Sequence, residues 1–383
     1  MEIGIQKRML PHVPWALLFA CLTVASIGIW NLASASRPPH SPVWTSQLVY
    51  LGVGLAAMTA VALVDYRFIQ RAAVPIYLIN IALLLALKVM GHRAKGAESW
   101  LVIGPFRMQP AEFMKLGMIL MLAKFFHDDY RPNVTGYGFL RLIPPTLLAI
   151  VPIVIVLIEP ELGTSLMMLF TAATMLVFAR VRWWVVAVIG VGALVAALVI
   201  WNDWVREQSE PRATVVRHFM KKHQEDRISA WLDPTADLRG KNYHSIQSKI
   251  AVGSGGLSGK GWMKGTQTGL FFLPEQHTDF IFSVWAEEHG FTACLLLLVL
   301  YGAVFLTSLG VAFNARDRFG AFVAVGVAAM IFWQVFENIG MVTGLLPVTG
   351  ITLPLMSYGG SSMVSVFLGI GLLVNISMRR HIF

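Results

Sequence analysis

The sequence predicts an all-α, polytopic membrane protein of about ten transmembrane helices, with one large external loop between the seventh and eighth. Three observations lead to this fold class. Hydrophobic residues make up 56% of the 383 residues and charged residues only 13%, a balance far from that of a soluble domain. Apolar runs long enough to cross a bilayer recur along the chain. Basic residues cluster in alternate connections between those runs.

The apolar runs are long enough, at about 20 residues, to cross a bilayer or to form shorter buried helices within a bundle. We expect residues 1–383 to form a single membrane-embedded domain around them. Lys7, Arg8 and Ala33-Ser34-Ala35 flank the first run as in a cleavable secretory signal, but the run is longer than a typical signal core, so we expect it to be retained. The predicted spans are residues 14–35, 44–64, 72–90, 111–126, 142–158, 162–179, 183–201, 280–313, 319–346 and 357–377.

Basic residues set the orientation of these spans, because cytoplasmic connections carry an excess of Lys and Arg. This rule places both termini in the cytoplasm and accounts for the net charge of +9 without a nucleic-acid partner. Arg93, Lys95 and Arg107 are exceptions, because they fall in an external connection. The cytoplasmic connections then carry Arg67 and Arg71, Lys124, Arg131 and Arg141, Arg180 and Arg182, and Arg316 and Arg318.

The connection between the seventh and eighth spans, residues 202–279, differs from the others in length and charge. Loops this long inside a compact unit are usually functional or disordered. Trp231, Tyr243 and Trp262 favour an ordered surface. Since the orientation places this loop outside the cytoplasmic membrane, we expect the chemistry on the external face.

Several familiar chemistries lack support. The two cysteines, Cys21 and Cys294, lie in apolar runs and indicate neither a disulfide nor a thiolate metal site. Residues 253–261, GSGGLSGKG, resemble a phosphate loop, but Ser254 and Gly261 stand where that motif needs a glycine and a hydroxyl residue. No zinc-protease, redox-disulfide or serine-hydrolase motif is present. We therefore predict no nucleotide site and no metal ligand set.

Residues 109–116, QPAEFMKL, combine a helix start with two charges. Pro110 suits the first helical turn, and Glu112 and Lys115, three residues apart, share one helix face. Lys115 would lie roughly 7 Å below the external helix end at 1.5 Å per residue. A helix N-terminus with a lysine beneath it suits a phosphate-type anion. Equally, the two charges neutralise each other and lower the cost of burial; spacing alone leaves both open.

Residues 273–290, LPEQHTDFIFSVWAEEHG, place ionisable groups where the external loop meets the eighth span. Asp279 is typical of a helix-capping residue, or of a carboxylate that takes a proton from a substrate hydroxyl beside Lys115. We rank Glu287 and Glu288, two turns deeper, as partners of such a site or as helix-packing groups.

Residues 345–362, LLPVTGITLPLMSYGGSS, interrupt the apolar sequence with prolines, glycines and hydroxyl residues. Non-helical backbone at membrane depth survives only where protein buries it or it lines a cavity, so we predict a re-entrant wall of a substrate groove. Before it, Gln334, Glu337 and Asn338 share a helix face, for which we favour a packing role.

Together these segments resemble the SEDS (shape, elongation, division, sporulation) family of polytopic peptidoglycan glycosyltransferases. The resemblance rests on QPAEFMKL (109–116), YHSIQSKIAVGSGGLSGKG (243–261), LPEQHTDFIF (273–282) and GLLPVTGITLPLMSYGGSS (344–362), in the family's order. It covers about residue 65 to the C-terminus. Gly265-Thr266-Gln267 is closer to the elongation member, RodA, than to the division member, FtsW. The sequence departs from the family pattern at two positions. Ala111 stands where the family usually has serine, and Asn242 stands where a glycine often precedes the tyrosine.

The resemblance implies a ten-helix fold whose external cavity polymerises lipid II, the undecaprenyl-diphosphate-linked precursor, in the cytoplasmic membrane. It implies a partner, a class B penicillin-binding protein transpeptidase, and places the family's essential residues on Asp279, Glu112 and Lys115. We predict Asp279 as general base, with Lys115 oriented by Glu112. The predicted substrate-binding residues are Arg93, Arg107, Gln109, His277, Pro347, Thr349, Ser357, Tyr358, Gly359, Gly360 and Ser361.

Three alternatives remain open. A lipid-precursor flippase or transporter would also use intramembrane charge and broken helices, although the candidate groups gather at the outer face and no repeated halves are visible. A scaffold would leave the chemistry to its partner. A division-specific paralogue would keep the chemistry but change the process. A divalent cation, Mg²⁺ or Mn²⁺, near Asp279 is also left open, since no ligand cluster demands it.

Overall fold

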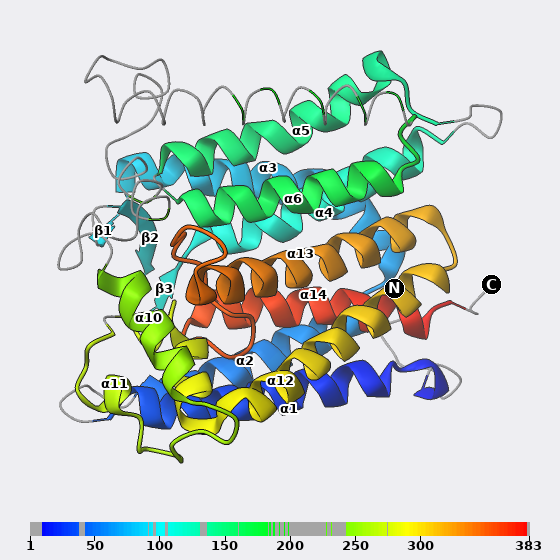
Figure 1. Cartoon of the computed structure of the whole chain (residues 1–383). Helices are drawn as coiled ribbons and strands as arrows, with labels where there is room; N and C mark the ends of the chain where they lie inside the picture. The colour runs from blue at the N-terminus through cyan, green and yellow to red at the C-terminus, as the bar shows by residue number, and fades with distance from the viewer. Residues whose placement is uncertain are drawn as a thin grey trace, which may run out of the picture.

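The protein is a bundle of long helices that run side by side (Figure 1). The predicted all-α membrane fold is confirmed, and by length and composition 7 of the described helices could cross a membrane. The computed structural model describes residues 10–37, 43–90, 92–94, 97–103, 106–130, 136–159, 161–182, 243–273 and 275–380, together with isolated positions from Trp184 to Trp231.

The helices follow the predicted spans, except that the seventh predicted span, 183–201, lies outside the described residues apart from isolated positions. A 3-10 turn, η1 (Leu10–His12), precedes the first helix. The long helices are α1 (Trp15–Ala35), α2 (Val43–Leu63), α3 (Tyr66–Met90), α4 (Pro110–Asp128), α5 (Phe139–Ile158), α6 (Leu162–Phe178), α12 (Ile281–Phe313), α13 (Arg318–Thr343) and α14 (Gly360–Met378).

The third span begins earlier than predicted, at Tyr66 instead of residue 72. The Asp65 carboxylate accepts a hydrogen bond from the backbone N–H of Arg67 (2.8 Å) and so satisfies a donor at the helix start. Arg67 and Arg71 are exposed, and an arginine near a helix end can extend to the membrane surface. The prediction was wrong here because it followed apolar residues alone.

The external connection between α3 and α4 contains a small sheet that the sequence analysis did not predict. Strands β1 (His92–Ala94), β2 (Ala97–Ile103) and β3 (Phe106–Met108) pair antiparallel in the order β1-β2-β3. Arg93 lies in β1, and Arg107 is paired with Val102 of β2. The side chains of Arg93 and Arg107 lie outside the described part of the structure, so their predicted role stays a prediction.

The centre of the bundle is formed by α13 and α14. Within an 18-residue window, 89% of α14 and 72% of α13 are buried, against 17% of α2. Large apolar side chains instead cover the periphery, for example Leu140 at 78% and Leu306 at 67% exposure. An apolar outer surface of this extent fits a lipid-facing wall. The two central helices therefore form the core on which the peripheral helices pack.

Helix α12 is broken near its external end. Gly290 has φ 74° and ψ −174°, which only glycine adopts easily. A break in a helix leaves backbone groups without their usual partners, and here the loop 255–261 supplies them. Lys260 N donates to Glu287 O (3.1 Å), Gly261 N donates to Glu288 O (2.9 Å), and Phe291 N donates to Gly256 O (2.9 Å).

This contact explains Gly255 and Gly259 in residues 253–261, the segment that resembles a phosphate loop. A Cβ at Gly259 would lie 2.2 Å from Glu288 O, and one at Gly255 would lie 2.0 Å from Ala286 O. Backbone can approach backbone this closely only without side chains. These two glycines therefore serve packing of the external loop against α12.

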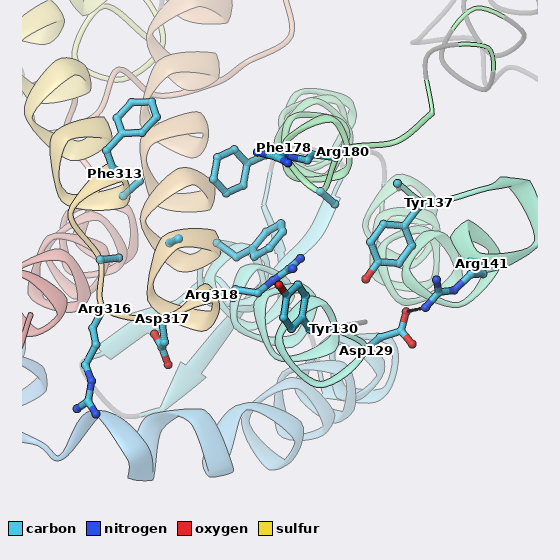
Figure 2. A pocket seen from close by; sticks show the side chains of 16 residues that line it. Asp129, Tyr130, Tyr137, Arg141, Phe178, Arg180, Phe313, Arg316, Asp317 and Arg318 are labelled. Carbon is cyan, nitrogen blue, oxygen red and sulfur yellow. Dashed lines mark hydrogen bonds and ion pairs between the residues drawn. The ribbon is translucent and has the colours of Figure 1, made fainter. Parts of the chain in front are cut away.

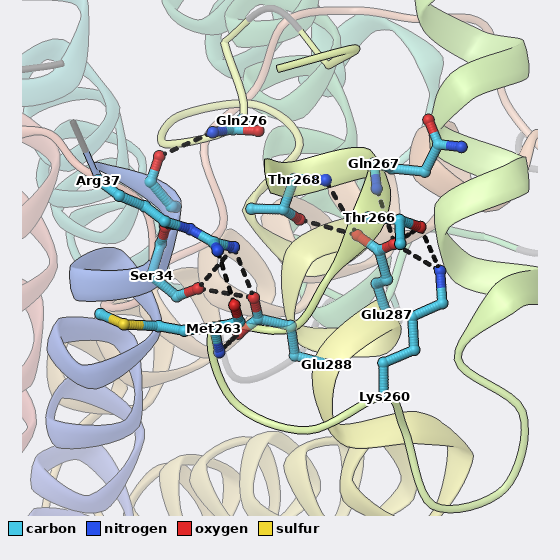
Figure 3. A network of polar contacts seen from close by, with 11 residues as sticks. Ser34, Arg37, Lys260, Met263, Thr266, Gln267, Thr268, Gln276, Glu287 and Glu288 are labelled. Carbon is cyan, nitrogen blue, oxygen red and sulfur yellow. Dashed lines mark hydrogen bonds and ion pairs between the residues drawn. The ribbon is translucent and has the colours of Figure 1, made fainter. Parts of the chain in front are cut away.

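Two adjacent carboxylates of α12 anchor the surrounding external segments (Figure 3). Glu287, fully buried, accepts hydrogen bonds from Lys260 Nζ (2.7 Å) and from the backbone and hydroxyl of Thr268 (3.1 and 2.9 Å). Glu288 accepts from Ser34 Oγ (2.6 Å), from Arg37 (3.1 Å) and from Met263 N (3.1 Å). The pair thus ties the end of α1 and the loop 260–268 to α12, in agreement with the predicted packing role.

We expect Glu287→Ala to lower the free energy of unfolding by about 3–5 kcal/mol, because it leaves Lys260 and the Thr268 donors without their buried partner. Thermal unfolding of the purified protein in detergent measures this. The matched control is Lys124→Ala, which breaks an exposed pair with Asp128 (2.8 Å) and should cost less than about 1 kcal/mol. Equal effects in both variants would contradict the anchoring role.

Candidate active site

The external end of α4 is tied to two other elements through Gln109. Gln109 has extended backbone (φ −103°, ψ 106°) and is followed by Pro110 at the first helical position, as predicted. Its backbone N–H donates to Ser361 Oγ (3.0 Å), at the start of α14. Its side-chain amide donates to Glu161 Oε1 (2.6 Å), just before α6. Gln109 and Ser361, both predicted to bind substrate, therefore lie together.

Glu112 and Lys115 form a buried ion pair one turn inside α4. Lys115 Nζ lies 2.8 Å from Glu112 Oε2, and the two residues are only 1% and 6% exposed. Ser365 of α14 adds a long hydroxyl contact to Glu112 (3.5 Å). The predicted pairing across one helix face is confirmed. Each charge lowers the cost of burying the other.

Glu337 of α13 adds a second carboxyl group near this pair. It is 2% exposed and interacts electrostatically with Lys115. Neither of its oxygens has a hydrogen-bond partner in the described structure. Polar packing, the role we favoured from sequence, does not account for such a group, because buried polar atoms are normally hydrogen-bonded. Lys115 therefore has two acidic neighbours.

The chain between α13 and α14 is non-helical and passes through the bundle, as predicted. It starts at Gly344, in the left-handed conformation (φ 82°). Its carbonyl groups are satisfied by side chains of other helices: Tyr301 donates to Pro354 O (2.6 Å) and Gln47 to Ser357 O (2.9 Å). Irregular backbone at this depth needs such partners.

This segment holds residues 277–279 by their backbone. Tyr358 N donates to His277 O (2.9 Å), and Ser357 Oγ donates to Thr278 O (2.6 Å). Asn338 of α13 donates to Asp279 O (2.9 Å) and also to Ile351 O (2.7 Å). Three successive carbonyls are thus hydrogen-bonded, so the backbone that carries Asp279 is fixed. The contacts seen here for His277, Ser357 and Tyr358 position the backbone next to Asp279.

The side chain of Asp279 lies beside Gly350 and Arg227. A Cβ added at Gly350 would be 3.6 Å from Asp279 Oδ2 and 3.8 Å from Arg227 Nη1. Arg227 also donates to Thr349 O (2.8 Å). Burial lowers the pKa of the Arg227 guanidinium, while the negative charge of Asp279 opposes that shift. A half-buried carboxylate and a cation therefore face the same point.

Asp279 does not occupy the N-cap position of α12. That position is Phe280, whose side chain makes no capping hydrogen bond.

The two groups of candidate residues meet on α13. Glu337 interacts electrostatically with Lys115, and the next residue, Asn338, holds the Asp279 carbonyl. The salt bridge of Lys115 is with Glu112, so direct contact between Lys115 and Asp279 stays a prediction.

The remaining predicted residues lie along the same segment. Thr349 is 6% exposed, and its carbonyl receives Arg227. Gly360 lies against the Tyr50 ring, where a Cβ would be 2.7 Å from the nearest ring carbon. Pro347 and Gly359 are half-buried in the same connection. Within the described residues, no group of three or more His, Cys, Asp or Glu could hold a metal ion.

Sequence reasoning missed Arg227 and the environment of Glu337. Arg227 lies among many charged residues of the loop 202–279, and no spacing separates it from them. Its partner Thr349 is 122 residues away, a relation that local pattern does not carry. Glu337 was assigned to the right helix face, but its distance to Lys115 depends on how α4 packs against α13.

The match to a family model settles the classification. A model described as "Cell cycle protein", of FtsW, RodA and SpoVE, matches residues 9–382. The chain belongs to this family, the SEDS family. The match also includes the first span, which carried no motif of its own.

Two relatives of this SEDS chain cover nearly all of it. "Peptidoglycan glycosyltransferase MrdB" of Escherichia coli K12 is 37% identical over 367 residues, covering 95% of this chain and 92% of the relative. "Stage V sporulation protein E" of Bacillus subtilis is 36% identical over 380 residues, covering 94% of this chain and 96% of the relative.

Solved structures share the SEDS fold. A chain of the structure described as "Structural coordination of polymerization and crosslinking by a peptidoglycan synthase complex" has a TM-score of 0.78 at 33% identity, covering 96% of this chain and 98% of that one. The Thermus thermophilus rod shape determining protein RodA has a TM-score of 0.68 at 29% identity, covering 96% of this chain and 97% of that one.

We expect Lys115→Met to lower the free energy of unfolding by about 3–5 kcal/mol, because it leaves Glu112 buried without its cation. Thermal unfolding in detergent measures the loss. The double variant Lys115→Met/Glu112→Gln removes the orphaned charge next to position 115 and should regain most of the stability. A single variant as stable as the wild type would refute the proposed charge balance.

Proposed function

We propose that this chain, a peptidoglycan glycosyltransferase of the SEDS family, polymerises lipid II into glycan strands at the outer face of the cytoplasmic membrane during cell elongation and shape maintenance. The observation that carries the proposal is the placement of Asp279. Its backbone is fixed by α13 and the non-helical segment, while its carboxylate stands half-buried beside Arg227.

Asp279 is the proposed general base. The acceptor sugar hydroxyl attacks the anomeric carbon of the donor, the bond from that carbon to the diphosphate oxygen breaks, and the hydroxyl proton passes to the Asp279 carboxylate. The bonding electrons leave with the lipid diphosphate. Direct displacement inverts the anomeric configuration. Holding donor and acceptor in line supplies much of the remaining rate.

Cationic groups would stabilise the departing diphosphate. Lys115, the N-terminal end of α4 and Arg227 supply positive charge at the external end of the bundle, with Arg93 and Arg107 as further predicted contributors. Arg227 suits this role because its guanidinium is held by the Thr349 carbonyl (2.8 Å). Glu112 would keep the Lys115 ammonium charged and in place.

A divalent cation near Asp279 stays a prediction. Within the described residues no cluster of three acidic, histidine or cysteine side chains is present, so Mg²⁺ or Mn²⁺ at Asp279 would take its remaining ligands from water and the donor diphosphate. Polymerisation that stops with EDTA and resumes with added Mg²⁺ would support this site. A polymerisation rate that is unchanged in EDTA would rule out a divalent cation at Asp279.

Support for elongation over division comes from the resemblance of Gly265-Thr266-Gln267 to the elongation member and from the structural likeness to RodA. Overall identity does not separate the branches, since MrdB and the sporulation protein are 37% and 36% identical. The segment 265–267 is bound to Glu287 through Gln267 N (2.9 Å), so it belongs to the ordered external surface.

A class B penicillin-binding protein is the proposed partner. The related chain in the peptidoglycan synthase complex belongs, by that description, to an assembly that combines polymerization and crosslinking. This chain resembles it over 96% of its length. Glycan made here would then pass to the partner's transpeptidase.

Asp279→Asn should lower the rate of lipid II polymerisation by about 10²- to 10⁴-fold, because the amide cannot accept the proton. The assay uses purified complex with a catalytically inactive transpeptidase partner, and thermal unfolding confirms the fold. Asp128→Asn, at the other end of α4 and with an exposed side chain, is the matched control. Near-normal polymerisation by Asp279→Asn would remove the proposed base.

Depletion of this chain in its host should give rounder cells that continue to divide, since side-wall synthesis would stop. Light microscopy after depletion measures cell width and septum number. Long filaments with stalled septa would instead assign the chain to division.

A further inference from the structure

A cavity of about 690 Å³ lies at the opposite end of the bundle from Asp279 and Lys115. It is enclosed by the ends of α4, α5, α6, α12 and α13, which we predict to be cytoplasmic (Figure 2). The proposed polymerase reaction does not use this cavity. Its size is within the range of ligand sites, about 300–1,000 Å³.

The lining of the cavity is positively charged. It contains four arginines, Arg141, Arg180, Arg316 and Arg318, and two aspartates, Asp129 and Asp317. Both aspartates are engaged by neighbouring groups: Asp129 is 2.8 Å from Arg141, and Asp317 caps α13 through Gly320 N (3.0 Å) and receives the Tyr66 hydroxyl. Four arginines against two aspartates leave the lining with an excess of positive charge.

Arg180 and Arg318 have no salt-bridge partner among the described residues. Arg318 lies over the Tyr130 ring, with its guanidinium carbon 4.2 Å from the ring centroid. Its Nε is buried and makes no hydrogen bond. Arg180 has positive φ (60°), and its carbonyl accepts from Tyr137 N (3.2 Å), which holds this unusual conformation. Two guanidinium groups without a carboxylate partner among the described residues, one of them stacked on Tyr130, are suited to a phosphate.

The cavity continues into the lipid-facing surface. Phe313, at the end of α12, is 79% exposed, and Phe178, at the end of α6, is 37% exposed. Figure 2 shows the two side chains extending from these helices on either side of α13. Aromatic residues at helix ends are typical of the membrane boundary. An occupant of the cavity would therefore contact both the arginines and acyl chains.

We infer that this cavity binds the phosphate headgroup of an anionic phospholipid of the inner leaflet. The phosphate contacts Arg180 and Arg318, and the acyl chains run past Phe178 and Phe313 into the bilayer. Basic pockets between membrane helices on the cytoplasmic side bind such headgroups. The aromatic edge favours a lipid over a soluble phosphate, which would have no use for it.

Native mass spectrometry of the full-length protein with phosphatidylglycerol tests this inference. Arg180→Gln/Arg318→Gln should bind the lipid about 30-fold more weakly, from the charge contribution expected for two arginines. The matched control, Arg67→Gln/Arg71→Gln, removes two exposed arginines at the same end of the bundle but outside the cavity, and should bind as the wild type does.

Three outcomes would overturn the inference. Equal loss in both double variants would mean unspecific surface attraction. Phosphatidylcholine bound as tightly as phosphatidylglycerol would remove the role of the arginines in selecting an anionic lipid. Displacement of phosphatidylglycerol by inorganic phosphate alone would assign the site to a soluble anion.

A second measurement on the wild-type protein does not depend on the variants folding. Photoactivatable phosphatidylglycerol, cross-linked in vesicles and mapped by peptide mass spectrometry, should label the segments around Phe178 and Phe313. Labelling spread evenly over the helix ends, with no excess at these two, would contradict the inference.

Discussion

Residues 277–279 have no regular secondary structure to hold them, yet each of their carbonyls is hydrogen-bonded. The partners are Tyr358 N, Ser357 Oγ and Asn338 Nδ2. These bonds depend on the non-helical chain between α13 and α14, which in turn needs Tyr301 and Gln47 to satisfy its carbonyls. The position of Asp279 therefore rests on contacts from several helices at once. Such support gives a reacting group a defined place.

Charge in this protein is kept in an apolar bundle by close pairing. Lys115 forms an ion pair with Glu112, with Glu337 as a further electrostatic neighbour, and Glu287 and Glu288 bind cations and backbone amides of the external segments. The two arrangements differ in use. Glu287 and Glu288 have all their contacts within the protein and organise the external loop, whereas Glu337 has oxygens without hydrogen-bond partners in the described structure. The arrangement around Lys115 and Glu337 therefore leaves room for rearrangement when an anion binds.

The sequence predicted the parts of this structure that follow from local pattern. Apolar runs located the long helices, and a spacing of three residues paired Glu112 with Lys115. The proline- and glycine-rich run before α14 identified the non-helical segment. The β1-β2-β3 sheet was not predicted, because its strands are short and only the charged residues of this connection were considered.

Other features depend on tertiary packing and could not be read from spacing. The start of α3 is fixed by Asp65, outside the apolar run. Arg227 donates a hydrogen bond to the carbonyl of Thr349, which lies 122 residues further along the chain. Glu337 approaches Lys115 only because α13 lies in the centre of the bundle. Residues that belong to a sequence motif can be identified before the structure is known. The partners that position them can be identified only from the folded structure.

A structure of this chain with lipid II and an acceptor glycan bound is the most direct test of the role of Asp279. The account predicts an Asp279 carboxylate oxygen within about 3.2 Å of the acceptor hydroxyl, with the donor diphosphate toward Lys115 and Arg227. An acceptor hydroxyl placed against another residue, with Asp279 directed away from it, would contradict the account.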